Sequence, residues 1–100
     1  MNIQKMMKQA AKMQEQLNEA LAAKTVEVGV GGGKITVVAN GLGDIISIKI
    51  AKEVVDPEDT EMLVDLILSG VKQAIEKGKG LAQSEVGRMT SGLGLPPGML

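Results

Sequence analysis

The sequence predicts an α+β fold in which a long helix, a three-stranded antiparallel meander and a second long helix follow one another. Two stretches, residues 2–23 and residues 62–81, place apolar side chains at steps of three and four residues, the spacing of an amphipathic helix. Between them, residues 26–50 hold three short runs in which apolar residues alternate with polar or small ones. This period of two is typical of half-buried strands. We expect one domain over residues 1–90 and a flexible tail, rich in glycine and proline, at residues 91–100.

The first predicted helix contains no glycine or proline and is rich in strong helix formers. Its apolar residues form an a/d seam that lasts about three heptads. The seam consists of Ile3, Met6, Ala10, Met13, Leu17 and Ala20. At 1.5 Å per residue the helix is about 33 Å long, which is more than a three-stranded sheet needs for cover. We therefore expect part of the helix to project or to pack against another helix. For its methionine-rich seam, packing in a core or a coiled coil is favoured over a role as an adaptable peptide-binding groove.

Three lysines of this helix, Lys5, Lys8 and Lys12, lie within about 60° of one another on the helix wheel, opposite the apolar seam. Two interpretations stay open: a solvated charged face, or a basic strip that contacts phosphates. The acidic residues Glu15 and Glu19 occur only further along. The first three turns therefore carry positive charge without local acidic partners.

The three predicted strands carry nine alternating apolar residues that can form one continuous face for the helices to cover. These residues are Val26, Val28, Val30, Ile35, Val37, Ala39, Ile46, Ile48 and Ile50. The breaks at residues 31–33 and 40–44 are rich in residues that tolerate positive φ, so both are predicted to be tight reversals. Three strands leave two open edges, and pairing with a second copy is an economical way to cover one of them. We therefore predict a homodimer.

The segment GVGGGK, at residues 29–34, invites comparison with phosphate-binding loops. A P-loop requires a glycine, four residues, then Gly-Lys-Ser/Thr and a following helix. Here Val28 occupies the first glycine position, Ile35 follows Lys34, and the next element is a strand. The dinucleotide-binding fingerprint fails on spacing and on context as well. The segment is therefore predicted to be a hairpin turn without a phosphate-binding role.

The second helix is predicted to begin in the cluster at residues 56–61, which supplies a candidate cap, a proline suited to a first turn and several acidic residues. Gly78 and Gly80 each cost about 1 kcal/mol relative to alanine in a helix interior. We therefore expect the helix to continue with a weak point there. The tail from Thr90 onward is too rich in glycine and proline to continue it.

Composition excludes several classes of function. Cysteine and histidine are absent, which excludes disulfides, thiolate or imidazole metal sites, and catalysis by either side chain. Asp59, Glu61 and Asp65 suggest a metal cluster, but helix capping and solvation are the favoured interpretation. No apolar segment approaches the roughly 20 residues that cross a bilayer. We expect a cytoplasmic protein with no membrane partner, no cofactor and no enzyme activity.

Nucleic-acid binding finds limited support in the bulk properties. The chain contains no Phe, Tyr or Trp, so it lacks the side chains on which single-strand and RNA readers stack bases. The net charge of −1 gives no global positive field. Binding to nucleic acid would therefore depend on local basic strips.

Four short motifs, in this order, resemble the YbaB/EbfC family of bacterial nucleoid-associated proteins. They are MMKQA at residues 6–10, GGGKITV at 31–37, NG at 40–41 and GLGLP at 92–96. The resemblance covers essentially the whole chain. It implies a homodimer shaped like tweezers, with long helices projecting from a joined sheet body, that binds double-stranded DNA at the nucleoid.

Two hypotheses follow. In the first, exposed cations contact backbone phosphates of double-stranded DNA with low sequence specificity. The candidate residues are Lys5, Lys8, Lys12, Lys72, Lys77, Lys79 and Arg88. In the second, the chain is an interaction module that docks a DNA replication or repair protein through its methionine-rich helix or a sheet edge.

Overall fold

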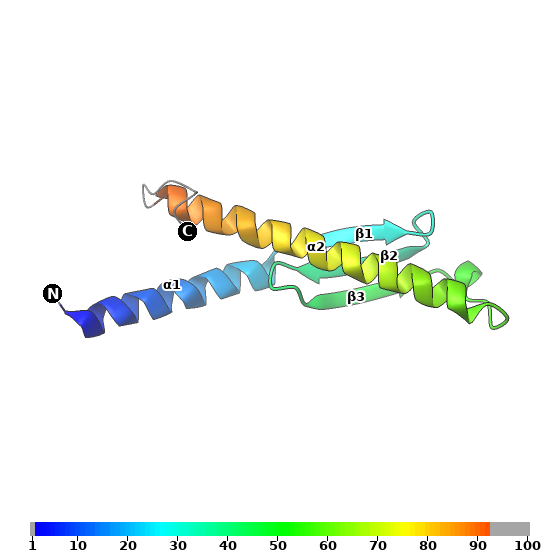
Figure 1. Cartoon of the computed structure of the whole chain (residues 1–100), viewed down its shortest axis with the longest axis horizontal. Helices are drawn as coiled ribbons and strands as arrows, with labels where there is room; N and C mark the ends of the chain where they lie inside the picture. The colour runs from blue at the N-terminus through cyan, green and yellow to red at the C-terminus, as the bar shows by residue number, and fades with distance from the viewer. Residues whose placement is uncertain (1, 93–100) are drawn as a thin grey trace.

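The computed structural model describes residues 2–92, which form two helices and a three-stranded sheet in an elongated body of 67 × 24 × 17 Å (Figure 1). The elements are α1 (Ile3–Ala23), β1 (Thr25–Val30), β2 (Ile35–Asn40), β3 (Ile45–Ile50), a short 3₁₀ turn η1 (Lys52–Val54) and α2 (Thr60–Gly92). This order confirms the predicted α+β fold of a helix, an antiparallel meander and a second helix.

The sheet has the strand order β1-β2-β3, and both pairs are antiparallel. The β1–β2 reversal uses Gly31, Gly32 and Gly33, whose φ angles are 64°, 72° and 85°. Residues with a Cβ rarely adopt this left-handed region, whereas glycine enters it at little cost. The three glycines of the GVGGGK segment therefore form a hairpin turn, as predicted, while Gly29 and Val30 end β1.

A register shift between Val38 and Ala39 corrects one part of the predicted apolar face. Ala39 lies opposite Ile45, although Val38 lies opposite Ser47. A bulge of this kind places one extra residue in a strand and reverses which side chains face the core. Ile45 therefore packs against the core, and Ile46, which was predicted to do so, is 54% exposed.

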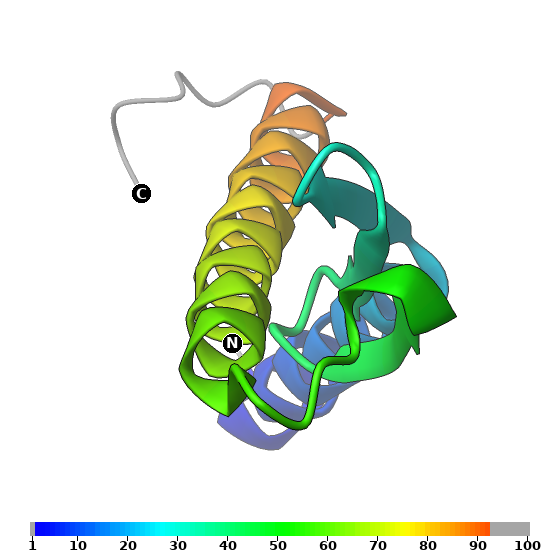
Figure 2. The ribbon, with the colours of Figure 1, turned by 90° about the vertical axis from the view of Figure 1, so that its right-hand side faces the viewer.

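The core lies between one face of the sheet and α2, which covers β1 and β2 but little of β3 (Figure 2). Its buried residues are Val28, Ile35, Val37, Ala39 and Ala74. Because α1 does not lie on the sheet, only one helix covers the predicted face. Ile48 and Ile50, which pair with Val37 and Ile35, stay exposed beyond α2.

α2 is one continuous helix through both of its predicted weak points. Gly78 is buried, and a Cβ on it would lie 2.5 Å from the carbonyl oxygen of Asn40. The glycine therefore allows α2 to approach the sheet closely, and this packing offsets its low helix propensity. The helix ends at Gly92, two residues beyond the predicted boundary of the tail. The rest of the predicted tail, residues 93–100, lies outside the described residues.

The start of α2 differs in detail from the prediction. The Asp59 Oδ1 atom accepts a hydrogen bond from the Met62 backbone N–H at 3.3 Å, which makes Asp59 the cap of the helix. Pro57 lies in the turn before the helix, not in its first turn. The Asp56 Oδ1 atom accepts from the Glu58 N–H at 2.9 Å and stabilises that turn.

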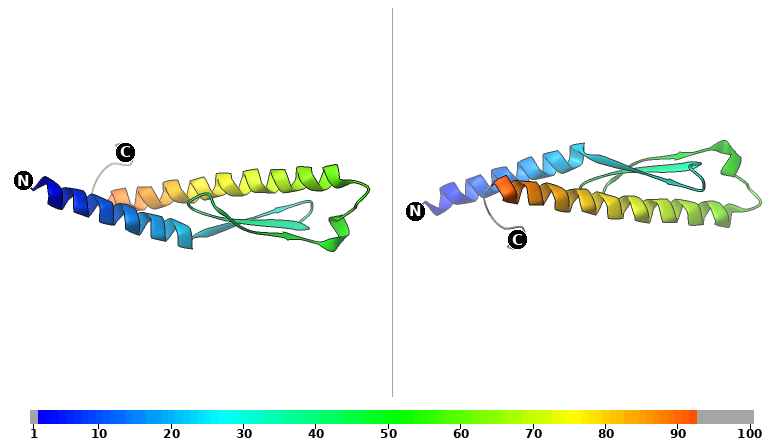
Figure 3. Two further views of the ribbon diagram at one scale, coloured as in Figure 1. Left: turned by 90° about the horizontal axis from the view of Figure 1, so that it is seen from below. Right: turned by 90° about the horizontal axis from the view of Figure 1, so that it is seen from above.

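α1 projects away from the sheet, as its length predicts (Figures 1 and 3). All residues from 2 to 16 are exposed, and among them Ile3 is 69% exposed. At its other end Leu21 is buried where the helix meets the sheet. Most of the apolar seam therefore lies uncovered in the single chain.

Candidate nucleic-acid interface

The two helices form a pair of projections at one end of the sheet. α1 leaves the sheet beside the β2–β3 turn, and α2 passes the same turn at Gly78 and continues beyond it (Figures 1 and 3). We call residues 3–16 of α1 the first arm and residues 79–88 of α2 the second arm. Both arms carry cations proposed from the sequence, so the fold brings separate basic segments to one end of the molecule.

The first arm presents Lys5, Lys8 and Lys12 as exposed side chains on one strip of α1. None of the three forms an ion pair with a side chain described in this structure. Asn2 caps the helix, because its Oδ1 atom accepts from the Lys5 N–H at 3.2 Å. The strip is therefore held on an ordered helix while its charges remain available to phosphates.

The cations of α2 do not share one face. Lys72 and Lys79 are seven residues apart and point in nearly the same direction, and Lys77 and Arg88, eleven apart, share another direction. At 3.6 residues per turn the two directions differ by about 140–180°. α2 therefore presents cations on two opposite flanks.

Arg88 is already engaged by an acidic residue that the sequence interpretation did not single out. Its Nη1 atom lies 3.4 Å from the Glu85 Oε2 atom, and the arginine side chain is 70% exposed. The same carboxylate oxygen accepts a hydrogen bond from the Lys24 Nζ atom at 2.6 Å. The i,i+3 spacing indicates the first contact, but no local pattern indicates the second, which joins residues 61 positions apart.

The environment of Glu85 favours its ionised form. The hydrogen bond from Lys24 lowers the pKa of the carboxyl below its ordinary value of 4.5. Desolvation opposes this shift, and the charges of Lys24 and Arg88 add to it. Glu85 is thus an anion at neutral pH, placed between two cations.

The β2–β3 turn ties the end of α1 to the sheet. The Asn40 Oδ1 atom accepts from the backbone N–H groups of Leu42 and Asp44, both at 3.0 Å. The Gly41 N–H donates to the carbonyl oxygens of Leu21 and Lys24 at 2.9 and 3.1 Å. Because these groups are satisfied within the chain, they form a structural joint and not an anion-binding loop.

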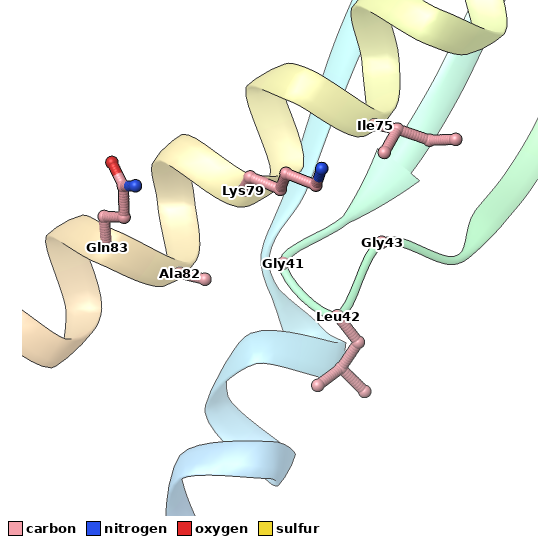
Figure 4. A pocket seen from close by; sticks show the side chains of 7 residues that line it. All are labelled: Gly41, Leu42, Gly43, Ile75, Lys79, Ala82 and Gln83. Atoms are coloured by element: carbon pink, nitrogen blue, oxygen red, sulfur yellow. The ribbon is translucent and has the colours of Figure 1, made fainter.

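An open hollow of about 570 Å³ lies beside this joint, between the turn and α2 (Figure 4). It is lined by Gly41, Leu42, Gly43, Ile75, Lys79, Ala82 and Gln83. Leu42, Ile75 and Ala82 make much of its wall apolar, and the Lys79 side chain lies along it (Figure 4). The hollow therefore suits an apolar partner better than a phosphate.

A larger set of uncovered apolar side chains, which we call the apolar flank, lies on β3 and on the first half of α2. Its members are Ile48, Ile50, Val64 and Leu68, all of which are exposed. Burying such side chains removes apolar surface from water and favours association. The flank is thus a candidate contact surface, separate from the lysine strip of the first arm.

Two other kinds of site find no support within residues 2–92. No group of three or more acidic side chains is arranged to hold a metal ion there, so the cluster suggested by Asp59, Glu61 and Asp65 is not assembled. Over the same residues, neither helix combines enough length and hydropathy to cross a membrane.

The sequence matches a family model, the YbaB/EbfC DNA-binding family, over residues 1–93. The chain belongs to this family. A nucleoid-associated protein of Ruminiclostridium cellulolyticum is 52% identical, in an alignment that covers 98% of this chain and 88% of the relative. One of Bacillus cereus is 53% identical, with 89% of this chain and 78% of the relative covered. The resemblance inferred from the sequence motifs is therefore confirmed.

A solved structure supports the fold independently of close sequence similarity. The crystal structure of an uncharacterized protein from Helicobacter pylori superposes with a TM-score of 0.65 at 21% identity, covering 84% of this chain and 98% of that one. At this identity the likeness concerns the fold alone. The YbaB/EbfC family is a DNA-binding family and not a known enzyme family.

Proposed function

We propose that the chain is a nucleoid-associated protein that binds double-stranded DNA as a homodimer, with low sequence specificity. The observation that carries the proposal is the first arm, whose lysines Lys5, Lys8 and Lys12 are exposed, share one strip and pair with no described acid. Family membership supports DNA as the ligand. The relatives named as nucleoid-associated proteins support a place at the bacterial nucleoid.

The mode of binding follows from the kind of side chain. Lysines on an exposed helix face reach phosphates as point charges and displace condensed counterions. Such contacts position a protein on a duplex but read no bases. On the second arm, Lys79 is exposed, and Arg88 is free to turn toward a phosphate, because its contact with Glu85 is long and exposed. Lys72 and Lys77 add charge closer to the sheet.

The apolar flank supports the dimer. Ile48 and Ile50 lie on the face that α2 covers elsewhere, and Val64 and Leu68 extend the flank along the helix. A two-fold assembly through this surface would bury it and would present two pairs of arms. Changing Ile48 and Leu68 together to aspartate should give a monomer in analytical ultracentrifugation. A wild-type mass near 10.4 kDa at micromolar concentration would contradict the dimer.

A salt-titrated DNA-binding measurement tests the phosphate contacts. The variant Lys5→Gln, Lys8→Gln, Lys12→Gln should bind a fluorescent duplex at least tenfold more weakly than wild type at low salt. Its slope of log affinity against log salt, which is negative, should become less steep by about 0.9 for each phosphate that the variant no longer neutralises. Fluorescence anisotropy at several salt concentrations measures both quantities, and an affinity that does not depend on salt would refute the phosphate model.

A matched control removes the same charge from the sheet body. Lys34, Lys49 and Lys52 are exposed residues away from the arms, and changing all three to glutamine lowers the net charge equally. We expect a loss smaller than threefold. If both variants lose the same affinity, net charge controls binding and the arms have no special role.

The alternative function is docking of a DNA replication or repair protein through α1 or a sheet edge. The exposed Ile3, Met6, Met7 and Met13 favour it, because methionines adapt to varied apolar partners. Under this alternative the glutamine variant of the three α1 lysines keeps its DNA affinity. The variant Met6→Ser, Met7→Ser would instead lose a specific partner.

A further inference from the structure

An ion pair between residues 61 positions apart joins the root of α1 to the second arm. Lys24 follows the last residue of α1, and Glu85 lies on the second arm. The Lys24 Nζ and Glu85 Oε2 atoms are 2.6 Å apart, and the Glu85 side chain is only 13% exposed. A short charge-assisted hydrogen bond with a shielded carboxylate is directional and resists screening better than a surface pair.

The roots of α1 and of the second arm are both held at the β2–β3 turn, close to this pair. The root of α1 is held by the Gly41 N–H, and the root of the second arm is held by the contact of Gly78 with Asn40. Both roots thus rest on one turn. Beyond these roots the first arm is exposed through residues 3–16. The Lys24–Glu85 contact adds a side-chain link between the root of α1 and the second arm.

The pair also affects the charge that DNA would meet. The second arm carries a carboxylate, Glu85, three residues before Arg88. A phosphate that approaches Arg88 is repelled by this carboxylate unless another cation balances it. Lys24 supplies that cation from the root of α1 at 2.6 Å, which leaves the more weakly held Arg88 available.

We propose that Glu85 is a positioning residue for DNA binding: through its ion pair with Lys24 it sets the separation of the two arms and therefore the spacing of the cations they present. This role rests on the DNA-binding function proposed above. Glu85 acts through geometry, and it makes no contact with DNA itself. Its removal should therefore weaken binding even though the chain becomes more positive.

Distances between the arms test the proposal without DNA. Because the chain contains no cysteine, spin labels can be attached at Gln9→Cys on the first arm and Ser84→Cys on the second. Diluting the labelled chain with excess unlabelled chain leaves only distances within one chain in pulsed dipolar spectroscopy. We expect Glu85→Gln to broaden and shift the distance distribution. A distribution identical to that of the unchanged ion pair would overturn the proposal.

The reversed pair Lys24→Glu with Glu85→Lys provides a rescue. It keeps the net charge and restores an ion pair of opposite direction, so it should return the distances toward those of the wild type. Circular dichroism on each variant shows that the secondary structure is retained. If the reversed pair stays as broad as Glu85→Gln, charge pairing does not set the separation, and the proposal fails.

A DNA-binding measurement tests the proposal by whether removing the Glu85 charge weakens or tightens the affinity for a duplex. Glu76→Gln on the same helix changes an exposed carboxylate that pairs with no described cation, and it adds the same charge as Glu85→Gln. We expect Glu76→Gln to tighten binding slightly and Glu85→Gln to weaken it at least threefold. Equal tightening by both would overturn the positioning role. If wild type binds no duplex at low salt, the proposed function fails, while the arm distances still decide the geometry.

Discussion

The sheet body and the first arm of this molecule are built on opposite principles. In the body, Ile35 and Val37 are fully buried beneath α2, and glycines allow the helix to touch the sheet. In the first arm every residue is exposed, including apolar ones such as Ile3 and Met7. The body is held by packing within one chain, whereas the arm is an ordered helix whose faces are open to other molecules.

This difference predicts that residues of the body control stability and residues of the first arm control binding. Substitutions of buried side chains in the body should act on folding and leave any DNA contact unchanged. Substitutions in the first arm should act on binding and leave folding of the chain unchanged. The Lys24–Glu85 pair joins the root of α1 to the second arm, so a substitution of Glu85 can affect both folding and binding.

The largest expected contrast comes from the same substitution at two isoleucines. Ile35→Ala in the body, where the side chain is 0% exposed, should lower the free energy of unfolding by about 2–5 kcal/mol, because it leaves a cavity in a packed core. Ile3→Ala in the arm, at 69% exposure, should change it by less than about 0.5 kcal/mol. Denaturant titrations followed by circular dichroism measure both. A large loss at Ile3 would show that a partner or a second copy covers the first arm.

A glycine pair in α2 sharpens the comparison at the place where the helix leaves the body. A Cβ on Gly78 would meet the Asn40 carbonyl oxygen at 2.5 Å, whereas one on Gly80 would meet nothing within 4 Å. Gly80→Ala should therefore stabilise the protein by about 1 kcal/mol through helix propensity. Gly78→Ala should destabilise it by about 1–3 kcal/mol, because the new Cβ would clash with the backbone of Asn40, which can move only by distorting the sheet. Thermal unfolding of the two variants gives the signs, and stabilisation by both would contradict the close approach.

Periodicity in the sequence was enough to predict the elements of the body, but not their contacts. Alternation placed the three strands, and residues 2–23 were correctly predicted as a projecting helix. Ile45 and Ile46 are both isoleucine, so hydropathy alone does not show which of them a bulge turns inward. Gly78 was interpreted as a weak point because its partner, Asn40, lies on another element.

The candidate site was predictable in one region and not in the other. The strip of Lys5, Lys8 and Lys12 lies on a single helix, so its spacing alone placed the three side chains together. The contact of Lys24 with Glu85 joins residues 61 positions apart, and only the folded chain brings them together. Local patterns therefore identified cations but not the acid that balances them.

The smallest expected effect is the dependence of stability on pH that Glu85 contributes through its ion pair with Lys24. Because its pKa is lower in the folded chain than the ordinary value of 4.5, its contribution is fully present above that pH. The contribution is then lost as the pH falls through the folded pKa, where the carboxyl becomes protonated. The difference in unfolding midpoint between wild type and Glu85→Gln should thus be constant near neutrality and shrink in acid.

Glu76 carries an exposed carboxylate on the same helix, so the variant Glu76→Gln is the control for general effects of acid on the fold. The Glu85→Gln difference is compared with the Glu76→Gln difference measured over the same pH range. High salt should reduce the Glu85 effect only in part, because Lys24 is half-exposed while the carboxylate is shielded. If the difference in unfolding midpoint between wild type and Glu85→Gln persists unchanged in acid, the Glu85 side chain stabilises the fold by its shape and not by its charge. The contact between the root of α1 and the second arm would then depend on packing alone.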